Sequence, residues 1–165
     1  MRSLPDPGYA GDDGSAPAAL VEALRAYDAD PDGRHDATLA LIQDARLLVP
    51  VVALLGEVEY DDQGLARDKT SDMATVLITG RDGRTALLAF TSSQTLQRWN
   101  PEARPVPVSA ARAAEAAVQD GATAIVVDVA GPVLFAVTTE ELSELAAGSV
   151  LVEVSGRYGW ATPDR

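Results

Sequence analysis

Three residue types that carry much of protein chemistry are almost missing from the chain. It has no cysteine, and only one histidine and one lysine among 165 residues. Without cysteine there is no disulfide, no thiolate ligand for a metal and no cysteine nucleophile, and this composition fits a reducing cytoplasm. No apolar run reaches the roughly 18 residues of a membrane-spanning helix, and residues 1–17 lack the apolar core of a signal peptide. We therefore expect a cytoplasmic protein.

Basic residues are scarce relative to acidic ones, most of all in the first half. The net charge at pH 7 is −12, with 15 acidic and 6 basic residues in residues 1–72 and 10 against 7 in the remainder. An acidic chain without a basic stripe repels both phosphate backbones and anionic lipid surfaces. We expect neither a nucleic-acid partner nor a membrane partner, and the simplest role of the charge is solubility.

The length and the 47% of apolar residues fit one globular domain. Residues 1–15 are rich in glycine, proline and aspartate and predict a disordered tail. We expect a single domain over residues 16–155 and a C-terminal tail over residues 156–165.

Apolar residues at helical spacing predict a first helix from about residue 17, and a second is expected over residues 37–45, with Asp36 as its N-cap. Residues 47–56 form the continuous apolar run typical of a buried strand. Pro50 lies inside that run and lacks an N–H group, so we expect it at an edge, a bulge or a strand end.

Two stretches, 73–99 and 122–148, share one pattern of strand, tight turn, strand and helix, with Thr91 and Thr138 as the expected helix caps. An extended segment over 104–108, an alanine-rich helix after it and a strand over 150–154 complete the chain. This order predicts the α+β class, with one central mixed sheet built from β-hairpin–helix units, helices packed against it and two N-terminal helices before it.

The sequence "YDADPDGRHD", residues 27–36, partly matches a calcium-binding EF-hand loop. Positions 1, 3, 5 and 9 of such a loop fall on Asp28, Asp30, Asp32 and Asp36. Position 12 falls on Leu39, which offers no oxygen to close the coordination sphere. We expect a solvated linker between two helices that contains an exposed His35, and weak cation binding by the four aspartates is the alternative.

The sequence contains no catalytic motif that we can identify, neither a G-x-S-x-G elbow nor a phosphate-binding loop. We expect no metal and no cofactor. Trp99 follows a short predicted helix, where an amphipathic ring either closes the core or anchors a partner. Together with Lys69, Asp72 and Arg104 it forms our candidate surface for a ligand or a partner.

Three segments, 45–57 ("ARLLVPVVALLGE"), 72–117 and 131–145 ("GPVLFAVTTEELSEL"), resemble the N-terminal domain of the SseB family in its actinobacterial members. The resemblance covers about residues 17–148 and rests on the order and wording of these segments. It implies a single-domain cytoplasmic α/β protein of a family that is named for serine sensitivity and has no defined molecular activity. It supplies no site residues. The similarly named sulfurtransferases need a cysteine, which this chain lacks.

Three functions remain open from the sequence, and the third is a calcium-responsive protein that acts through the loop over residues 28–36. The first is a non-enzymatic interaction or accessory domain whose partner is another protein. The second is a small-ligand sensor, or an enzyme of unknown chemistry, with a pocket near Lys69, Asp72, Trp99 and Arg104. A concave pocket at those residues is the feature that distinguishes the second function from the first.

Overall fold

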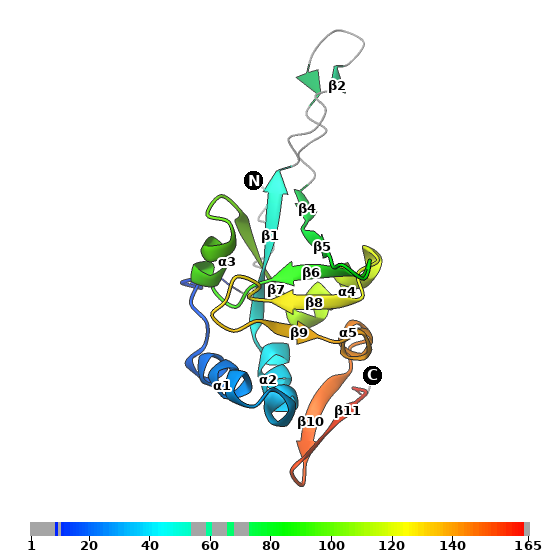
Figure 1. The fold of residues 1–165 in the computed structure, drawn as a ribbon. Coiled ribbons are helices and arrows are strands. Elements are labelled where there is room, and N and C mark those ends of the chain that lie inside the picture. The colour runs from blue at the N-terminus through cyan, green and yellow to red at the C-terminus, as the bar shows by residue number, and fades with distance from the viewer. Residues whose placement is uncertain (1–8, 10, 54–58, 61–65, 68–72, 164–165) are drawn as a thin grey trace.

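The computed structural model describes residues 9, 11–53, 59–60, 66–67 and 73–163. Figure 1 shows the elements in chain order. The helices are α1 (Ala18–Ala29), α2 (Pro31–Asp44), α3 (Ser93–Trp99), α4 (Ala110–Gln119) and α5 (Thr139–Ala146). The strands are β1 (Arg46–Ala53), β2 (Glu59–Tyr60), β3 (Ala66–Arg67), β4 (Met73–Thr75), β5 (Leu77–Thr79), β6 (Thr85–Ala89), β7 (Arg104–Ser109), β8 (Ala124–Val127), β9 (Phe135–Val137), β10 (Val150–Val154) and β11 (Arg157–Ala161). The predicted α+β class and the two N-terminal helices are confirmed.

The central sheet is built in two parts. One part is antiparallel, in the order β4-β1-β7, and the other has the order β5-β6-β8-β9. A bridge joins them, because the N–H of Leu48 in β1 donates to the carbonyl of Phe90 and the N–H of Phe90 donates to the carbonyl of Leu48, both at 2.8 Å. The sheet is mixed, since β6 and β8 are parallel while the other pairs are antiparallel.

Both predicted β-hairpin–helix units are present. Strands β5 and β6 form an antiparallel hairpin followed by α3, and β8 and β9 form a second hairpin followed by α5. Thr138 caps α5 in a capping box with Glu141, as expected. The two units meet through the parallel pair β6–β8, so the chain after β6 and the chain after β8 leave the sheet at the same edge.

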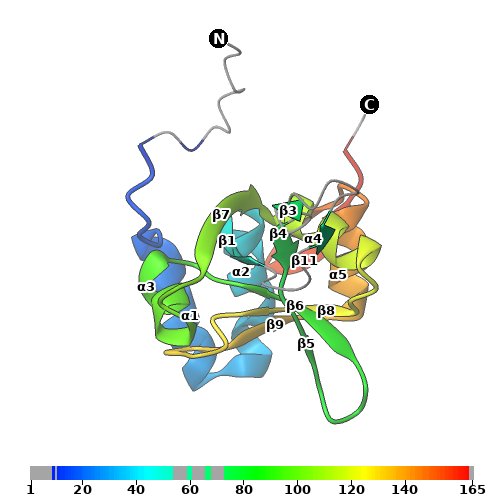
Figure 2. The ribbon, with the colours of Figure 1, turned by 90° about the horizontal axis from the view of Figure 1, so that it is seen from above.

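The alternation of side chains along β6 divides the core between two faces of the sheet. Leu87 and Ala89 pack into the larger cluster, which also contains apolar residues of α1, α2, α4 and α5. Leu88 and Phe90 point to the other face, where they pack with Leu96 of α3. Helix α3 therefore lies apart from α4 and α5, which Figure 2 also shows.

Helix α2 begins six residues before the predicted start. Asp30 is its N-cap and accepts a 3.1 Å hydrogen bond from the N–H of Gly33, and Pro31 is the first helical residue. Aspartate at the N-cap followed by proline is a strong helix start, because the carboxylate satisfies a free N–H group and the proline ring fixes φ near its helical value. The expected linker over residues 27–36 and the expected cap at Asp36 were therefore wrong.

Pro50 lies within β1 and not at a strand end. The backbone groups of Leu48 point away from β7 towards Phe90, so those of Pro50, two residues later, point to the same side. Pro50 then occupies the gap between this bridge and β4, whose pairing begins at Val51. Pro105 is opposite Pro50, and its nitrogen faces the free edge of β7, where no N–H group is needed.

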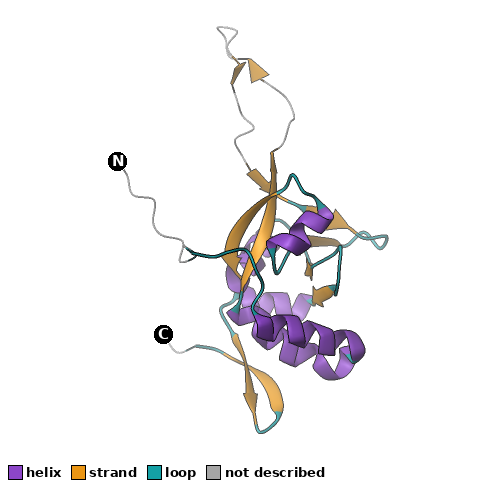
Figure 3. Ribbon diagram, turned by 90° about the vertical axis from the view of Figure 1, so that its left-hand side faces the viewer, coloured by secondary structure: helices purple, strands orange, loops and turns teal. Residues whose placement is uncertain are grey.

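The residues expected as a C-terminal tail include strand β11, which pairs with β10 as an antiparallel hairpin. Figure 3 shows this hairpin projecting from the body of the protein beside the helices. Gln43 of α2 fastens it, since its side-chain amide accepts from the N–H of Leu151 at 2.8 Å and donates to the carbonyl of Leu151 at 2.7 Å. The amide occupies the place that a neighbouring strand would take along β10.

We expect Gln43→Ala to loosen this hairpin selectively. The substitution leaves both backbone groups of Leu151 without their protein partner, at a cost of about 1–2 kcal/mol. Hydrogen exchange followed by NMR should show faster exchange in β10 and β11 and unchanged exchange in β6 and β8. Gln119→Ala on the exposed end of α4 is the matched control and should change neither region. If the amides of β10 exchange equally slowly in Gln43→Ala and in the wild type, Gln43 does not fasten the hairpin.

Among the described residues, no helix combines the length and the apolar character needed to cross a membrane.

Candidate functional site

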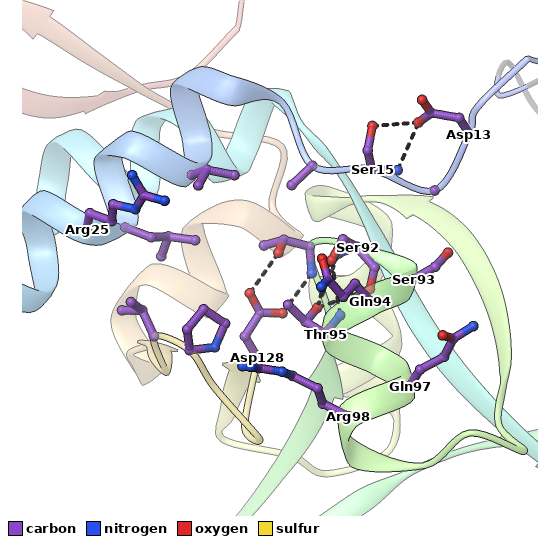
Figure 4. A pocket seen from close by; sticks show the side chains of 17 residues that line it. Asp13, Ser15, Arg25, Ser92, Ser93, Gln94, Thr95, Gln97, Arg98 and Asp128 are labelled. Carbon is purple, nitrogen blue, oxygen red and sulfur yellow. Dashed lines mark hydrogen bonds between the residues drawn. The ribbon is translucent and has the colours of Figure 1, made fainter.

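A cavity of about 680 Å³ opens where the two hairpin–helix units leave the sheet. Figure 4 shows the side chains that line it. Four parts of the chain contribute: residues 13–16, helix α1, residues 91–98, which lead into α3 and form most of it, and the connection from β8 to β9. We call residues 12–15 the strap and this space the strap cavity.

Asp128 is the buried polar residue of the cavity wall. It directly follows β8, its residue exposure is 1%, and its backbone φ is 55°, in the left-handed region. Its carboxylate accepts hydrogen bonds from the N–H of Thr91 at 2.9 Å and from the hydroxyl of Thr91 at 2.7 Å. Burial raises the pKa of Asp128 above its usual range, although the hydrogen bonds from Thr91 act in the opposite direction.

The parallel pairing of β6 and β8 explains why Thr91 and Asp128 meet. Ala89 of β6 is paired with Val127 of β8, so the residues that follow these two strands lie at one edge of the sheet. Thr91, predicted as the helix cap, turns inward to Asp128 instead. The N-cap is Ser92, whose hydroxyl accepts from the N–H of Thr95 at 3.1 Å in a capping box with the Thr95 side chain.

The strap closes one side of the cavity and is held by Arg46 of β1. The guanidinium donates to both carboxylate oxygens of Asp12 at 2.5 and 3.1 Å, to the carbonyl of Thr91 at 2.6 Å and to the carbonyl of Ser15 at 2.8 Å. The hydrogen bonds from Arg46 lower the pKa of Asp12. Residues 12–15, expected to belong to a disordered tail, are thus bound to the domain.

Gly14 lets the strap approach α3 closely. Its carbonyl accepts from the N–H of Ser93 at 2.8 Å, and its φ is 82°. A Cβ at this position would lie 2.3 Å from the Ser93 hydroxyl oxygen. Only glycine combines this left-handed conformation with such close contact at low cost.

Two arginines, Arg25 of α1 and Arg98 of α3, line the cavity with exposed side chains. Neither forms an ion pair or a side-chain hydrogen bond with any residue that the structure describes. In Figure 4 the Arg98 side chain extends beneath Asp128, and its Nη1 lies 3.9 Å from the place of a Cβ on Gly131. The guanidinium is thus beside the β8–β9 connection.

The rest of the wall mixes apolar and polar groups. The apolar part consists of Val21, Leu24, Pro132 and Val133, and the polar part includes Gln94 and Gln97 of α3. A volume of this size together with a few polar groups on an apolar surface is typical of a small-molecule site.

Three of the hydroxyl groups that line the cavity are committed to structure, whereas the Ser93 hydroxyl has no hydrogen-bond partner, and so no base, among the described residues. Ser92 and Thr95 satisfy the start of α3, and Thr91, 3% exposed, donates its hydroxyl to Asp128. A nucleophile needs both an accessible oxygen and a base aligned with it. The Thr91–Asp128 pair has the hydrogen bond but lies inside the wall, so this geometry favours binding over bond-making.

The residues of the predicted ligand or partner surface lie elsewhere. Trp99 ends α3, is partly buried and packs with its ring centre 5.7 Å from that of Phe90. Arg104 is the exposed first residue of β7. Neither of them lines the strap cavity, and Lys69 and Asp72 lie outside the described residues. A joint surface of the four residues stays a prediction.

The acidic residues of the predicted calcium loop are spread along two helices. Asp28 is in α1, Asp30 caps α2, and Asp32 and Asp36 lie within α2, all of them exposed. In the described part of the chain, no three acidic or histidine side chains gather closely enough to hold a metal ion. Weak cation binding by these aspartates stays an untested alternative.

His35 is not in an exposed linker. It lies in α2, and its Nε2 is 2.9 Å from both carboxylate oxygens of Glu141, while its ring stacks on Phe135 at a centre distance of 4.7 Å. Its side chain is 24% exposed. These contacts join α2 to the start of α5 and to β9, so His35 has a packing role that sequence proximity to the aspartates did not indicate.

Sequence reasoning missed the strap cavity, and one weak signal for it was present. Asp128 follows the apolar strand β8 directly, and Thr91 follows the apolar end of β6. Polar residues directly after parallel strands collect at one edge of a sheet, where α/β proteins often bind ligands. The parallel pairing itself was not predicted, so this signal could not be read.

A family model described as the SseB protein N-terminal domain matches residues 20–144 of the chain. This range includes α1 from its third residue, the β6–α3 and β8–β9 connections and Asp128, but begins after the strap. No curated protein and no solved structure matches the chain.

Proposed function

Since the chain belongs to the SseB family, we propose that it is a non-enzymatic accessory domain of that family and that it acts by binding a small molecule in the strap cavity. The observation that carries this proposal is the cavity itself, about 680 Å³ in volume with Asp128 buried in its wall. Cavities of this size are few in a small domain and are lined as ligand sites are.

The arrangement around the cavity favours recognition over catalysis. Binding needs fixed donors and acceptors, and Asp128 and Thr91 supply a rigid wall because each holds the other. The strap adds a wall that is held by hydrogen bonds from Arg46 and Ser93 and not by apolar packing alone. A partner protein for the accessory role, cytoplasmic location and actinobacterial type are further expectations of this proposal.

The test is a screen of small-molecule fragments by NMR against the wild-type protein. We expect a subset to shift the amide signals of Thr91, Ser92 and Asp128 together, because these amides surround the cavity. Val21→Trp should weaken the binding of those fragments at least about tenfold, since the indole enters the cavity from α1 and occupies part of it.

Val118→Trp is the matched control. Val118 is an exposed valine on another helix, α4, and does not line the cavity, so this variant should bind the fragments as the wild type does. If no fragment shifts the cavity amides, or if Val21→Trp binds as tightly as Val118→Trp, the cavity is not the binding site and the proposal is wrong.

A further inference from the structure

The charges around the strap cavity do not follow the charge of the whole chain. The chain has 25 acidic and 13 basic residues, and its field as a whole opposes the approach of anions. Two arginines nevertheless line this cavity, and neither is bonded to another described side chain. Arginine is the side chain that binds carboxylates and phosphates with two parallel hydrogen bonds.

Neither of the two acidic residues of the cavity forms an ion pair with these arginines. Asp13 accepts from the N–H of Ser15 at 2.9 Å and from the Ser15 hydroxyl at 2.5 Å, and Figure 4 shows it on the strap, turned to Ser15. Asp128 is buried and receives both donors of Thr91, and burial favours its neutral form. Arg98 lines the same cavity and forms no ion pair with a described residue, so its guanidinium can bind a ligand.

We infer that the strap cavity binds a small organic anion, with its carboxylate or phosphate group at Arg98 and a short apolar part against Val21, Pro132 and Val133, while Arg25 adds positive charge to the cavity from α1. The side-chain amides of Gln94 and Gln97 give further donors on the same side of α3. Arg98 is the main contact, because its guanidinium lies next to Gly131 at the β8–β9 connection, whereas Arg25 approaches from α1. This inference rests on the proposed function and specifies its ligand.

Four compounds with one isobutyl-type tail test the inference: isobutyrate, isobutyl phosphate, neutral isobutyramide and cationic isobutylamine. Affinities are measured by NMR titration of the wild-type protein at constant ionic strength. We expect at least one of the two anions to bind about tenfold more tightly than isobutyramide, and isobutylamine to bind most weakly. The comparison of isobutyrate with isobutyl phosphate shows which head group the site prefers.

Arg98→Gln removes the charge and keeps a polar side chain of similar reach. It should reduce the tenfold preference for the anion to less than about twofold and leave the affinity for isobutyramide unchanged. Arg25→Gln should give a smaller loss. Arg112→Gln is the matched control, because Arg112 is an exposed helix arginine outside the cavity, and it should retain the full preference.

The outcomes separate this inference from the proposed function. The anion inference is wrong if isobutyramide or isobutylamine binds as tightly as both anions. It is also wrong if Arg98→Gln retains the preference for the anion. In both cases the cavity can still be a ligand site. If Arg112→Gln reduces the anion-induced shifts as much as Arg98→Gln does, binding depends on the general surface charge. This result would also overturn the anion inference. The absence of cavity shifts with all four compounds would contradict the inference, and with a negative fragment screen it would contradict the proposed function as well.

Discussion

Asp128→Ala is expected to lower the free energy of unfolding by about 3 kcal/mol. The substitution leaves the N–H and the hydroxyl of Thr91 buried without an acceptor, and each such group costs about 1–3 kcal/mol. Alanine is also disfavoured at the φ of 55°, by about 1–2 kcal/mol. Urea unfolding followed by circular dichroism measures the loss.

Asp128→Asn is the matched variant that keeps the shape of the side chain. Its amide oxygen can accept from the N–H of Thr91, its amide group can donate to the Thr91 hydroxyl, and asparagine tolerates a left-handed backbone. Because the hydroxyl proton of Thr91 loses its acceptor, we expect a loss of about 1 kcal/mol at neutral pH. A loss in Asp128→Ala no greater than that of Asp128→Asn would contradict the role of these hydrogen bonds.

The raised pKa of Asp128 also predicts how stability depends on pH. The unfolded chain releases this proton near pH 3.8, whereas the folded protein holds it to higher pH because burial disfavours the charge. The stabilising contribution of the proton is complete below pH 3.8 and is lost as the pH rises through the raised pKa. Asp128→Asn has no such proton, so the difference in stability between the variant and the wild type should change over that interval and be constant above it. A constant difference from pH 3 to pH 7 would contradict the raised pKa.

The parts of the fold that could be predicted depend on local rules. The β-hairpin–helix units follow from alternating and continuous apolar runs, from turn residues and from helix caps, all of which act within a few residues. Thr138 caps the helix expected of it. Thr91 does not cap α3, because a distant residue, Asp128, takes its hydroxyl and leaves Ser92 as the cap.

The errors in the acidic segment show local signals in competition. Both Asp30 and Asp36 are good caps, and the calcium-loop spacing drew attention to the aspartates as a group. The proline after Asp30 decides for the earlier start, since Pro31 is favourable at the first position of a helix and Asp36 then lies one turn inside it. His35 falls on the inner side of α2, and its partner Glu141 is 106 residues away.

The candidate site could not be predicted because its residues come from separate segments. The cavity forms only after β6 and β8 pair in parallel, because this pairing brings together the strap, α1, α3 and the β8–β9 connection. No rule of local spacing places Arg98 beside Gly131. Trp99, singled out from the sequence, instead packs against Phe90. A single sequence indicates which residues can bind a ligand, while the sheet order decides which of them face one cavity.

Arg46→Ala is expected to release the strap and to lower the free energy of unfolding by about 2–3 kcal/mol. The guanidinium makes four hydrogen bonds and its side chain is only 10% exposed, so alanine leaves the carbonyls of Thr91 and Ser15 without their donor. The N–H of Ser93, which donates to Gly14 of the strap, should exchange with solvent much faster. Urea unfolding and hydrogen exchange measure the two effects.

Two further variants distinguish a specific clamp from a general charge effect. Arg46→Lys keeps the charge but cannot bond Asp12 through two parallel donors while also reaching the carbonyls, so we expect about half of the loss. Arg112→Ala removes an exposed arginine and should change neither stability nor exchange at Ser93.

Because Arg46 lowers the pKa of Asp12, the pair stabilises the fold above pH 3.8 and loses this effect as the pH falls below it. Arg46→Ala should therefore lose less stability on acidification than the wild type, and an equal loss in both proteins would show that the pair of Arg46 and Asp12 does not stabilise the fold.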